Sequence, residues 1–371
     1  MKYLKLFILL LCSSFFFACE KKNNTIAEES NWTGNEQVTV GQERGEIEFP
    51  KCYNAVIDGV KFNMCIEVPE NVNLNNLTKS EAVLQSPNQN NIVDVFMMER
   101  NVKEKLDIQE NAVYVVFEDG ATLYASKEFL NYSTQIFQKI HSAFRIEKTS
   151  LYNADVYSKD EEFDFMCPED AFENVLENIK KAGYCVEETD YNYYALNSNI
   201  MKQEEREFDK EGEEITSNEN NWSDSDNSYY FFARQIFQGL PVYYGTQNFP
   251  QDTEENRPIQ ALVSERGLER LDVFNLYTFC ELDEKVKMID FQNVVEKVAY
   301  KYGDILTDSQ YEVKRATLYQ VPVKKVSGDY DVKIAWLFEV YEGDIDKETG
   351  ESVEYILYSI IDAETGEEIA I

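Results

Sequence analysis

Cysteines are the residues of this chain whose types and spacing predict chemistry most directly. Lys2 and Lys5 precede an apolar run, Leu6–Phe17, that is too short to span a membrane, and Cys19 follows it directly after an alanine. This order predicts a lipoprotein export signal over residues 1–19 with cleavage before Cys19. Two acyl chains on Cys19 would then anchor the protein in membrane lipid, on the extracytoplasmic face of the cell membrane. Plain secretion and an uncleaved anchor are the alternatives.

A second pair of cysteines lies in a predicted β-hairpin. The segments Cys52–Ile57 and Val60–Cys65 flank Asp58-Gly59, a strong signal for a two-residue type I′ turn. Counting outward from the turn places Cys52 opposite Cys65 at a non-hydrogen-bonded site, where the backbones approach to about 4.5 Å. Because this spacing suits a disulfide, we predict a Cys52–Cys65 bond that acts as a structural staple, with a redox function as the alternative.

The pairing of the remaining cysteines stays open. Cys167 and Cys185 bracket a predicted helix of about 14 residues, whose ends lie about 20 Å apart, so they are not expected to bond each other. Cys280 could reach either one. Five cysteines remain in the mature body, an odd number, so at least one thiol stays free or pairs between chains.

Catalytic and metal-binding patterns are not found in the sequence. The chain has one histidine, His141, in a predicted helix, and no G-x-S-x-G, H-E-x-x-H or phosphate loop. We therefore expect no enzyme activity and assign no catalytic residue, cofactor or metal ligand. Calcium is the alternative at two acidic clusters, although neither has the glycine and terminal glutamate of a calcium-binding loop. The clusters are Asp224, Asp226 and Asn227, and Asp344, Asp346 and Glu348.

The charge of the chain limits its partners. The formal net charge is −34 and becomes −34 − 2 = −36 when residues 1–19 are removed, because they carry two lysines and no acid. Such a field repels nucleic acid, so no nucleic-acid partner is expected. The simple explanation of the many acidic residues is that they keep the protein soluble, and a specific cationic ligand is the alternative.

The elements that must position these residues include an internal repeat. The helical run 172–179 matches 291–298, and the strand-like run 232–239 matches 336–343. A third match joins 263–271 to the terminal run 361–369. The sequence therefore predicts an α+β protein with two tandem units, each a helix followed by three antiparallel strands.

These motifs carry a resemblance. The final strand reads Asp-Ala-x-Thr-Gly-Glu-x-Ile from Asp362 to Ile369, and with the preceding helix and aromatic strand it resembles the PepSY superfamily. Tyr230-Phe231-Phe232 with Gly239-Leu240-Pro241-Val242 is similar to membrane-anchored regulators of the cell-wall sensor kinase of Gram-positive bacteria. The whole chain resembles an uncharacterised Gram-positive surface lipoprotein family. The resemblance covers about residues 150–371, supplies no catalytic residues, and implies inhibition, regulation or binding.

The domain organisation follows from these patterns. Within the first folded segment, Thr78–Leu84 is expected to form a short helix and Ile92–Glu99 a strand. The predicted parts are a signal peptide (1–19), a disordered tether (20–46), an N-terminal α+β domain (47–150), a first PepSY-like unit (151–275) with an acidic loop (201–228), and a second unit (276–371).

The leading functional hypothesis is a membrane-anchored, non-enzymatic lipoprotein that binds or regulates a protein or peptide partner at the cell surface. A lipoprotein that binds a small cationic or sugar-like ligand is the alternative, and a surface hydrolase is the third possibility.

Overall fold

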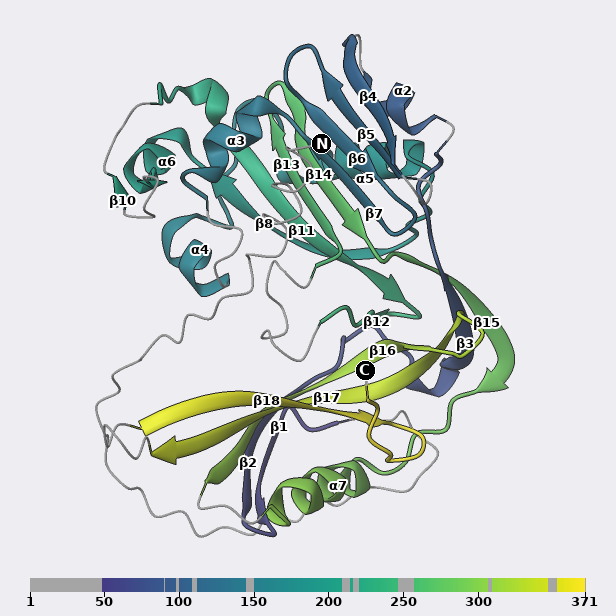
Figure 1. Cartoon of the computed structure of the whole chain (residues 1–371). Coiled ribbons are helices and arrows are strands. Elements are labelled where there is room, and N and C mark those ends of the chain that lie inside the picture. The colour runs from purple at the N-terminus through teal and green to yellow at the C-terminus, as the bar shows by residue number, and fades with distance from the viewer. Residues whose placement is uncertain are drawn as a thin grey trace.

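The computed structural model contains two large β-sheets, one above the other, and helices pack against both of them (Figure 1). It is a mixed α+β structure made mostly of strands. The residues that the structure describes are 49–89, 91–97, 100–108, 112–144, 150–208, 214–215, 220–245, 257–305, 309–345 and 352–370.

The upper sheet has nine strands, and its order mixes early and late segments of the chain. In spatial order the strands are β12 (Leu240–Pro241), β11 (Ser228–Phe237), β13 (Ile259–Ser264), β14 (Gly267–Phe274), β7 (Phe129–Ser133), β6 (Thr122–Ala125), β5 (Ala112–Phe117) and β4 (Val102–Ile108), with β8 (Thr189–Leu196) also paired to β11.

The lower sheet has seven strands and joins the two ends of the described chain. Its strands β2 and β16 are parallel, and their partners Phe62 and Val313 lie far apart in the sequence. In spatial order the strands are β1 (Cys52–Ile57), β2 (Val60–Glu67), β16 (Gln310–Lys324), β17 (Tyr330–Ile345), β3 (Thr78–Leu84) and β15 (Tyr277–Lys285), with β18 (Ser352–Asp362) also paired to β17. A small separate sheet pairs β9 (Glu207–Phe208) with β10 (Glu214–Ile215).

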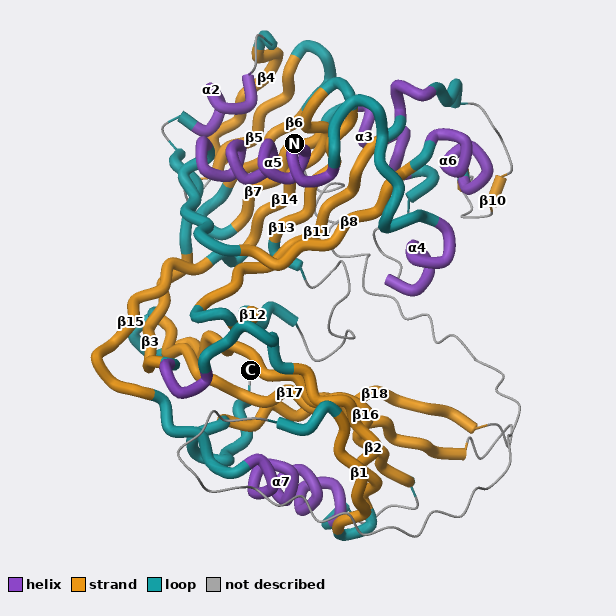
Figure 2. Tube along the Cα trace, turned by 180° about the vertical axis from the view of Figure 1, so that it is seen from behind, coloured by secondary structure: helices purple, strands orange, loops and turns teal. Residues whose placement is uncertain are grey.

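The two longest described helices each cover one sheet. Helix α5 (Pro168–Lys181) begins with proline and two acids and ends with two lysines, an order that suits the helix dipole. It lies across one face of the nine-stranded sheet, as Figure 2 shows from behind. Helix α7 (Phe291–Gly303) packs its valines on the seven-stranded sheet. The shorter helices are α2 (Ile92–Met97), α3 (Gln135–His141), α4 (Ser150–Val156), α6 (Ser198–Glu204) and the 3-10 helices η1 (Leu74–Asn76) and η2 (Asp224–Asp226).

The two repeated segments have the same element order. In each, a helix precedes three antiparallel strands, and the second strand in the sequence lies between the other two in the sheet. These strands are β8, β11 and β13 after α5, and β16, β17 and β18 after α7. The glycines after the third strands, Gly267 and Gly366, both have positive φ, 104° and 71°. Each set of three strands is part of a larger sheet that also contains strands from other segments of the chain.

Residues 47–150 differ from the expected separate domain, because their strands are divided between the two sheets. Strands β1 to β3 belong to the seven-stranded sheet, and β4 to β7 belong to the nine-stranded sheet. The physical reason is long-range pairing: β2 adds to β16, and β7 adds to β14. Two local expectations are also wrong, since Thr78–Leu84 is strand β3 and Ile92–Met97 is helix α2.

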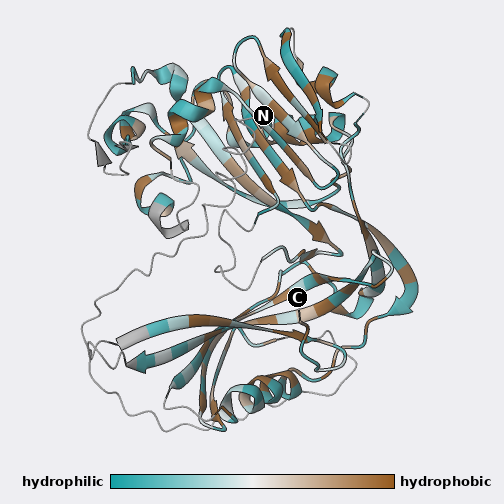
Figure 3. Ribbon diagram, in the orientation of Figure 1, coloured by the Kyte–Doolittle hydropathy of each residue, from teal (hydrophilic) through white to brown (hydrophobic). Residues whose placement is uncertain are grey.

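Separate apolar cores lie on the helix-covered faces. Phe172, Val175 and Ile179 of α5 pack with Val115 and Phe231 of the nine-stranded sheet. A second core joins α7 to β2, β16 and β17 around the buried Trp336. Figure 3 shows apolar residues, in brown, along the strands of both sheets.

The segment after β11 connects the two sheets. Gln238 donates from Nε2 to Oγ1 of Thr78 at 2.6 Å, and the Tyr243 amide donates to the Gln320 carbonyl at 2.8 Å. Arg234 on β11 donates to the Tyr319 hydroxyl on β16 at 3.1 Å. These contacts are hydrogen bonds from residues on or after β11 to residues of the seven-stranded sheet. They help to hold the two sheets in position relative to each other.

Candidate protein interaction site

The predicted anchor lies outside the described part of the chain. Cys19, the export signal and residues 20–46 of the predicted tether fall there, so lipidation and localisation remain predictions. Within the described residues, no helix combines the length and apolarity that membrane crossing requires.

The Cys52–Cys65 hairpin has the predicted register. Asp58 and Gly59 both have positive φ, 50° and 82°, which is the type I′ turn, and Cys52 lies opposite Cys65. The Ile66 amide donates to the Lys51 carbonyl at 2.9 Å, so the adjacent cysteine pair occupies a non-hydrogen-bonded site.

The two thiols are close enough to affect each other. Negative charge on Cys52 is the main cause that raises the pKa of Cys65 above its ordinary value. Both cysteines are exposed and carry free thiols in the structure, so the disulfide remains a prediction that the confirmed register supports.

The other three cysteines lie on different elements. Cys167 is the residue before α5, Cys185 follows that helix, and Cys280 lies on β15 of the other sheet. The Cys185 amide donates to Oε1 of Gln85 at 2.7 Å, which ties the end of the helical segment to the chain after β3. All three are free thiols in the structure.

Strand β4 is an outer edge of the nine-stranded sheet. Among the described residues its strand partner is β5, and all seven of its side chains are exposed. The pairing puts Leu106 beside Tyr114 and Tyr114 beside Tyr124, so an apolar row crosses three strands. Leu106 is 47% exposed and Ile108 is 45% exposed.

This row lies on the sheet face opposite to α2 and α5. Val113, Val115 and Phe117 of β5 point to the core beneath these helices, so the alternate residues Tyr114 and Val116 point to the other face. Figure 1 looks onto that other face, where α3 covers the strands further along the sheet. The side chains near β4 remain partly exposed, which is the condition for contact with a partner.

A hollow of about 390 Å³ lies next to the same edge, on the helix-covered side. Lys105 and Asp107 of β4 are two residues apart, share this side and form an ion pair of 3.7 Å. The hollow therefore offers both charge signs beside a strand whose outer side has no strand partner among the residues that the structure describes. Its lining residues are Gln89, Val93, Lys105, Asp107, Ile108, Ala112 and Val113.

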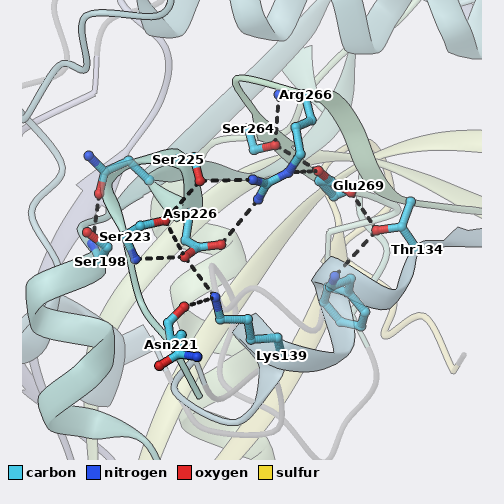
Figure 4. A network of polar contacts seen from close by, with 12 residues as sticks. Thr134, Lys139, Ser198, Asn221, Ser223, Ser225, Asp226, Ser264, Arg266 and Glu269 are labelled. Atoms are coloured by element: carbon cyan, nitrogen blue, oxygen red, sulfur yellow. Dashed lines mark hydrogen bonds and ion pairs between the residues drawn. The ribbon is translucent and has the colours of Figure 1, made fainter.

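The acidic loop expected at 201–228 contains a carboxylate that is held by two cations (Figure 4). Asp226 is almost fully buried and accepts from Lys139 Nζ at 2.7 Å, from Arg266 Nη2 at 3.3 Å and from the Ser223 amide at 2.9 Å. Burial alone would raise the pKa of Asp226, but the hydrogen bonds from Lys139 and Ser223 outweigh it and lower that pKa. The carboxylate therefore serves a structural role rather than presenting free oxygens to calcium.

A second buried carboxylate continues this network. Glu269 accepts from the Thr134 hydroxyl, from Ser264 Oγ at 2.8 Å and from Arg266 Nε at 3.3 Å. Thr134 is also the N-cap of α3, since its hydroxyl accepts from the Phe137 amide. The network in Figure 4 thus joins α3, η2 and the β13–β14 turn, and its donors and acceptors are used internally.

A third carboxylate is shared by two arginines. Arg234 and Arg257 contact Asp190 at 2.9 and 3.0 Å, and Arg257 is 2% exposed. Burial alone would raise the pKa of Asp190, but the two guanidinium groups outweigh it and lower that pKa. Because Arg234 also bonds Tyr319, this cluster stabilises the junction between the sheets.

Catalytic constellations are not evident in the described part of the chain. His141 is at the end of α3, with its ring 5.5 Å from that of Phe137. The described residues contain no group of three or more His, Cys, Asp or Glu side chains arranged to hold a metal ion. Of the second acidic cluster, Asp346 and Glu348 lie outside the described residues.

The β4 edge was missed in the sequence, although a signal is present. Val102-Lys103-Glu104-Lys105-Leu106-Asp107-Ile108 alternates partly between apolar and charged residues, as an edge strand does. That pattern predicts a strand over residues 102–108 but does not predict which strands lie beside it. Its place at the outside of the sheet depends on the pairing of β7 with β14, which joins distant parts of the chain.

Comparisons with known proteins establish the fold alone. No family model matches the chain, and no curated protein matches it. A crystal structure of an uncharacterized protein from Eubacterium rectale ATCC 33656 is similar, with a TM-score of 0.58 and 17% sequence identity. The match covers 87% of this chain and 94% of that one, so the two-sheet arrangement as a whole is shared with that protein.

Proposed function

We propose that the protein is a non-enzymatic lipoprotein that binds a protein or peptide at the outer surface of the cell membrane. The observation that carries this proposal is the partly exposed apolar row on the open face of the nine-stranded sheet, Leu106, Tyr114 and Tyr124. Partly exposed aromatic side chains beside apolar ones are typical of protein interfaces.

The predicted anchor at Cys19 supports the same proposal, because it would hold this face near membrane proteins. The two helix-plus-three-strand segments support a PepSY-like assignment, whose modules regulate or inhibit rather than catalyse. A regulatory partner would be a sensor kinase, a protease or a wall enzyme.

The proposal is tested by capture of the tagged, lipidated protein from native membranes after mild crosslinking, followed by mass spectrometry. We expect one membrane or wall protein to be enriched over the same capture with an unrelated lipoprotein of equal expression. A Tyr114→Lys variant should lose this enrichment, because it changes the open face while leaving the buried residues of β5 in place. Equal recovery with the unrelated lipoprotein would contradict the proposal.

A small-ligand-binding lipoprotein is the second candidate, and a hollow at the end of the chain favours it. The hollow, of about 310 Å³, is lined by three carboxylates and one lysine. Asp362 accepts from the Glu364 and Thr365 amides and Glu368 pairs with Lys301, so Glu367 is the carboxylate that would meet a cationic ligand. Spermidine and other polyamines are suitable probes, and a rise in melting temperature that is lost in Glu367→Gln would support this candidate. The lining residues are Val323, Lys333, Asp362, Thr365, Glu367, Glu368, Ile369 and Ala370. A surface hydrolase ranks third, to be tested with a broad substrate panel.

A further inference from the structure

We propose that Cys52 and Cys65 are a reversible redox site, at which a thiol reductant opens and a disulfide oxidant closes one bond in the folded protein. A redox function is the alternative to a purely structural bond at this position. The register, the exposure and the surroundings of the pair favour it. The inference is separate from the proposed binding function and does not depend on it.

The register brings the two cysteines to a position where a bond can form. Cys52 and Cys65 are directly opposite each other, and the charge of Cys52 raises the pKa of Cys65, so the thiols already interact. Cα atoms at a non-hydrogen-bonded site are about 4.5 Å apart, whereas disulfides usually span about 5.5 to 6 Å. A bond made away from the usual spacing is more easily reduced, so this position suits opening as well as closing.

Both cysteines lie on the water-facing side of the hairpin. Buried and exposed side chains alternate along β2, and the exposed Cys65 follows Met64, which packs in the core with α7. On β1, Tyr53 and Ala55 pack against the same core, so Cys52 points the other way. Exposed disulfides are the labile ones, because a thiolate has to reach one of the two sulfur atoms.

The hairpin has other contacts that keep it folded when the bond is open. The Ile66 amide donates to the Lys51 carbonyl at 2.9 Å, and the Tyr53 hydroxyl donates to Oε1 of Gln292 on α7 at 2.7 Å. The Tyr53 ring also makes an edge contact with the ring of Phe291, with 6.2 Å between centroids. Opening the bond therefore loosens the start of β1, an outer strand of the seven-stranded sheet, and leaves the rest of the sheet in place.

The exchange needs two thiols from the reductant. The thiolate of the first attacks one sulfur of the pair, which breaks the Cys52–Cys65 bond and forms a mixed disulfide, and the other cysteine leaves as a thiolate and takes up a proton. The second thiol attacks the mixed disulfide and releases the remaining cysteine. Two electrons pass to the pair, and the reductant ends as its own disulfide. The reverse sequence closes the bond.

The test uses the full-length lipidated protein in detergent and glutathione as the probe. The protein is equilibrated in mixtures of reduced and oxidised glutathione, quenched with acid and labelled with a maleimide. Mass spectrometry then counts the labels on each cysteine, and trypsin separates Cys52 from Cys65 by cutting after Lys61. The same measurement is made with Cys167→Ser, Cys185→Ser and Cys280→Ser combined, which removes exchange with the three cysteines on other elements.

We expect glutathione mixtures to hold the oxidised and reduced states together, with the same ratio from either starting state. The rate of reduction in the folded protein should be within about tenfold of the rate in urea, because the pair is exposed in the fold. In the reduced protein, hydrogen exchange should quicken at the Tyr53 amide, next to the cysteines, and stay unchanged in α7. In the control Cys52→Ser/Cys65→Ser, exchange at Tyr53 should not respond to glutathione.

Contrary results separate a redox site from a structural bond. Protein that stays oxidised in every glutathione mixture, or that is reduced only in urea, would overturn the proposal and leave the bond as a structural staple. Oxidised protein without the Cys52–Cys65 link would overturn it as well. The binding function is decided by the membrane capture, whose result does not depend on the state of these cysteines.

Discussion

At the scale of single residues, the buried carboxylates of the nine-stranded sheet are structural. Asp226 exemplifies this, because one carboxylate is shared by Lys139 and Arg266 while it is 3% exposed. Removing one partner of a buried ion pair leaves the other charges without compensation, which is more destabilising than loss of an exposed pair.

The first prediction concerns this carboxylate. Asp226→Asn should reduce the free energy of unfolding by about 3 kcal/mol, the usual size for breaking a buried pair. Chemical denaturation at pH 7 measures the change. Glu177→Gln is the matched control, because the exposed pair of Glu177 with Lys181 should contribute less than about 0.5 kcal/mol.

The pH dependence of stability gives an independent check. Because the pKa of Asp226 is lowered in the folded protein, its stabilising effect is present above the unfolded pKa of about 4 and is lost as the pH falls through the folded pKa. The difference between wild type and Asp226→Asn should therefore shrink on acidification below pH 4. A difference that is unchanged down to pH 2 would contradict the role assigned to the network.

At the scale of elements, the sequence predicted structure well where the deciding contacts are local. The Asp58-Gly59 turn fixes the register of β1 and β2 within a few residues, and the apolar stripe of α5 defines its buried face. Prediction from the sequence failed where contacts between distant parts of the chain determine the secondary structure. Thr78–Leu84 contains good helix formers but becomes β3 because it pairs with β15 and β17.

The hairpin also gives a prediction at this scale. Oxidised protein should lose about 2 to 3 kcal/mol of stability when the predicted Cys52–Cys65 disulfide is reduced. Thermal melts with and without reductant measure this, with the double variant Cys52→Ser/Cys65→Ser as the control that should not respond. Mass spectrometry of the oxidised protein should find the two peptides linked, and two free thiols after export to an oxidising compartment would contradict the prediction.

At the scale of the whole molecule, each sheet is completed by strands from the first third of the chain. The order of helix and three strands was readable because it repeats, but the parallel pairing of β2 with β16 leaves no local signal. The candidate edge β4 depends on the same kind of pairing, since β7 must join β14 before β4 can lie outermost. Sequence patterns therefore gave the parts of the molecule more reliably than its boundaries.

This arrangement predicts that residues 151–371 do not fold alone, although they contain both repeated segments. The fragment lacks ten large buried side chains from the earlier strands, including Phe62 and Phe117. These side chains belong to the same two apolar cores as α5 and α7, so the shorter fragment would expose to water the core residues that they cover. The ten residues are Val60, Phe62, Met64, Ile66, Val113, Val115, Phe117, Leu123, Leu130 and Tyr132.

Circular dichroism and thermal melting of two fragments test this prediction. Residues 47–371 should show a cooperative transition, because they keep every described strand of both sheets. Residues 151–371 should aggregate or melt without a transition, and adding residues 47–150 in trans should restore the signal if the missing strands are the cause. A sharp transition in the shorter fragment alone would mean that the repeated segments form independent domains, and that the early strands only extend sheets that are already stable.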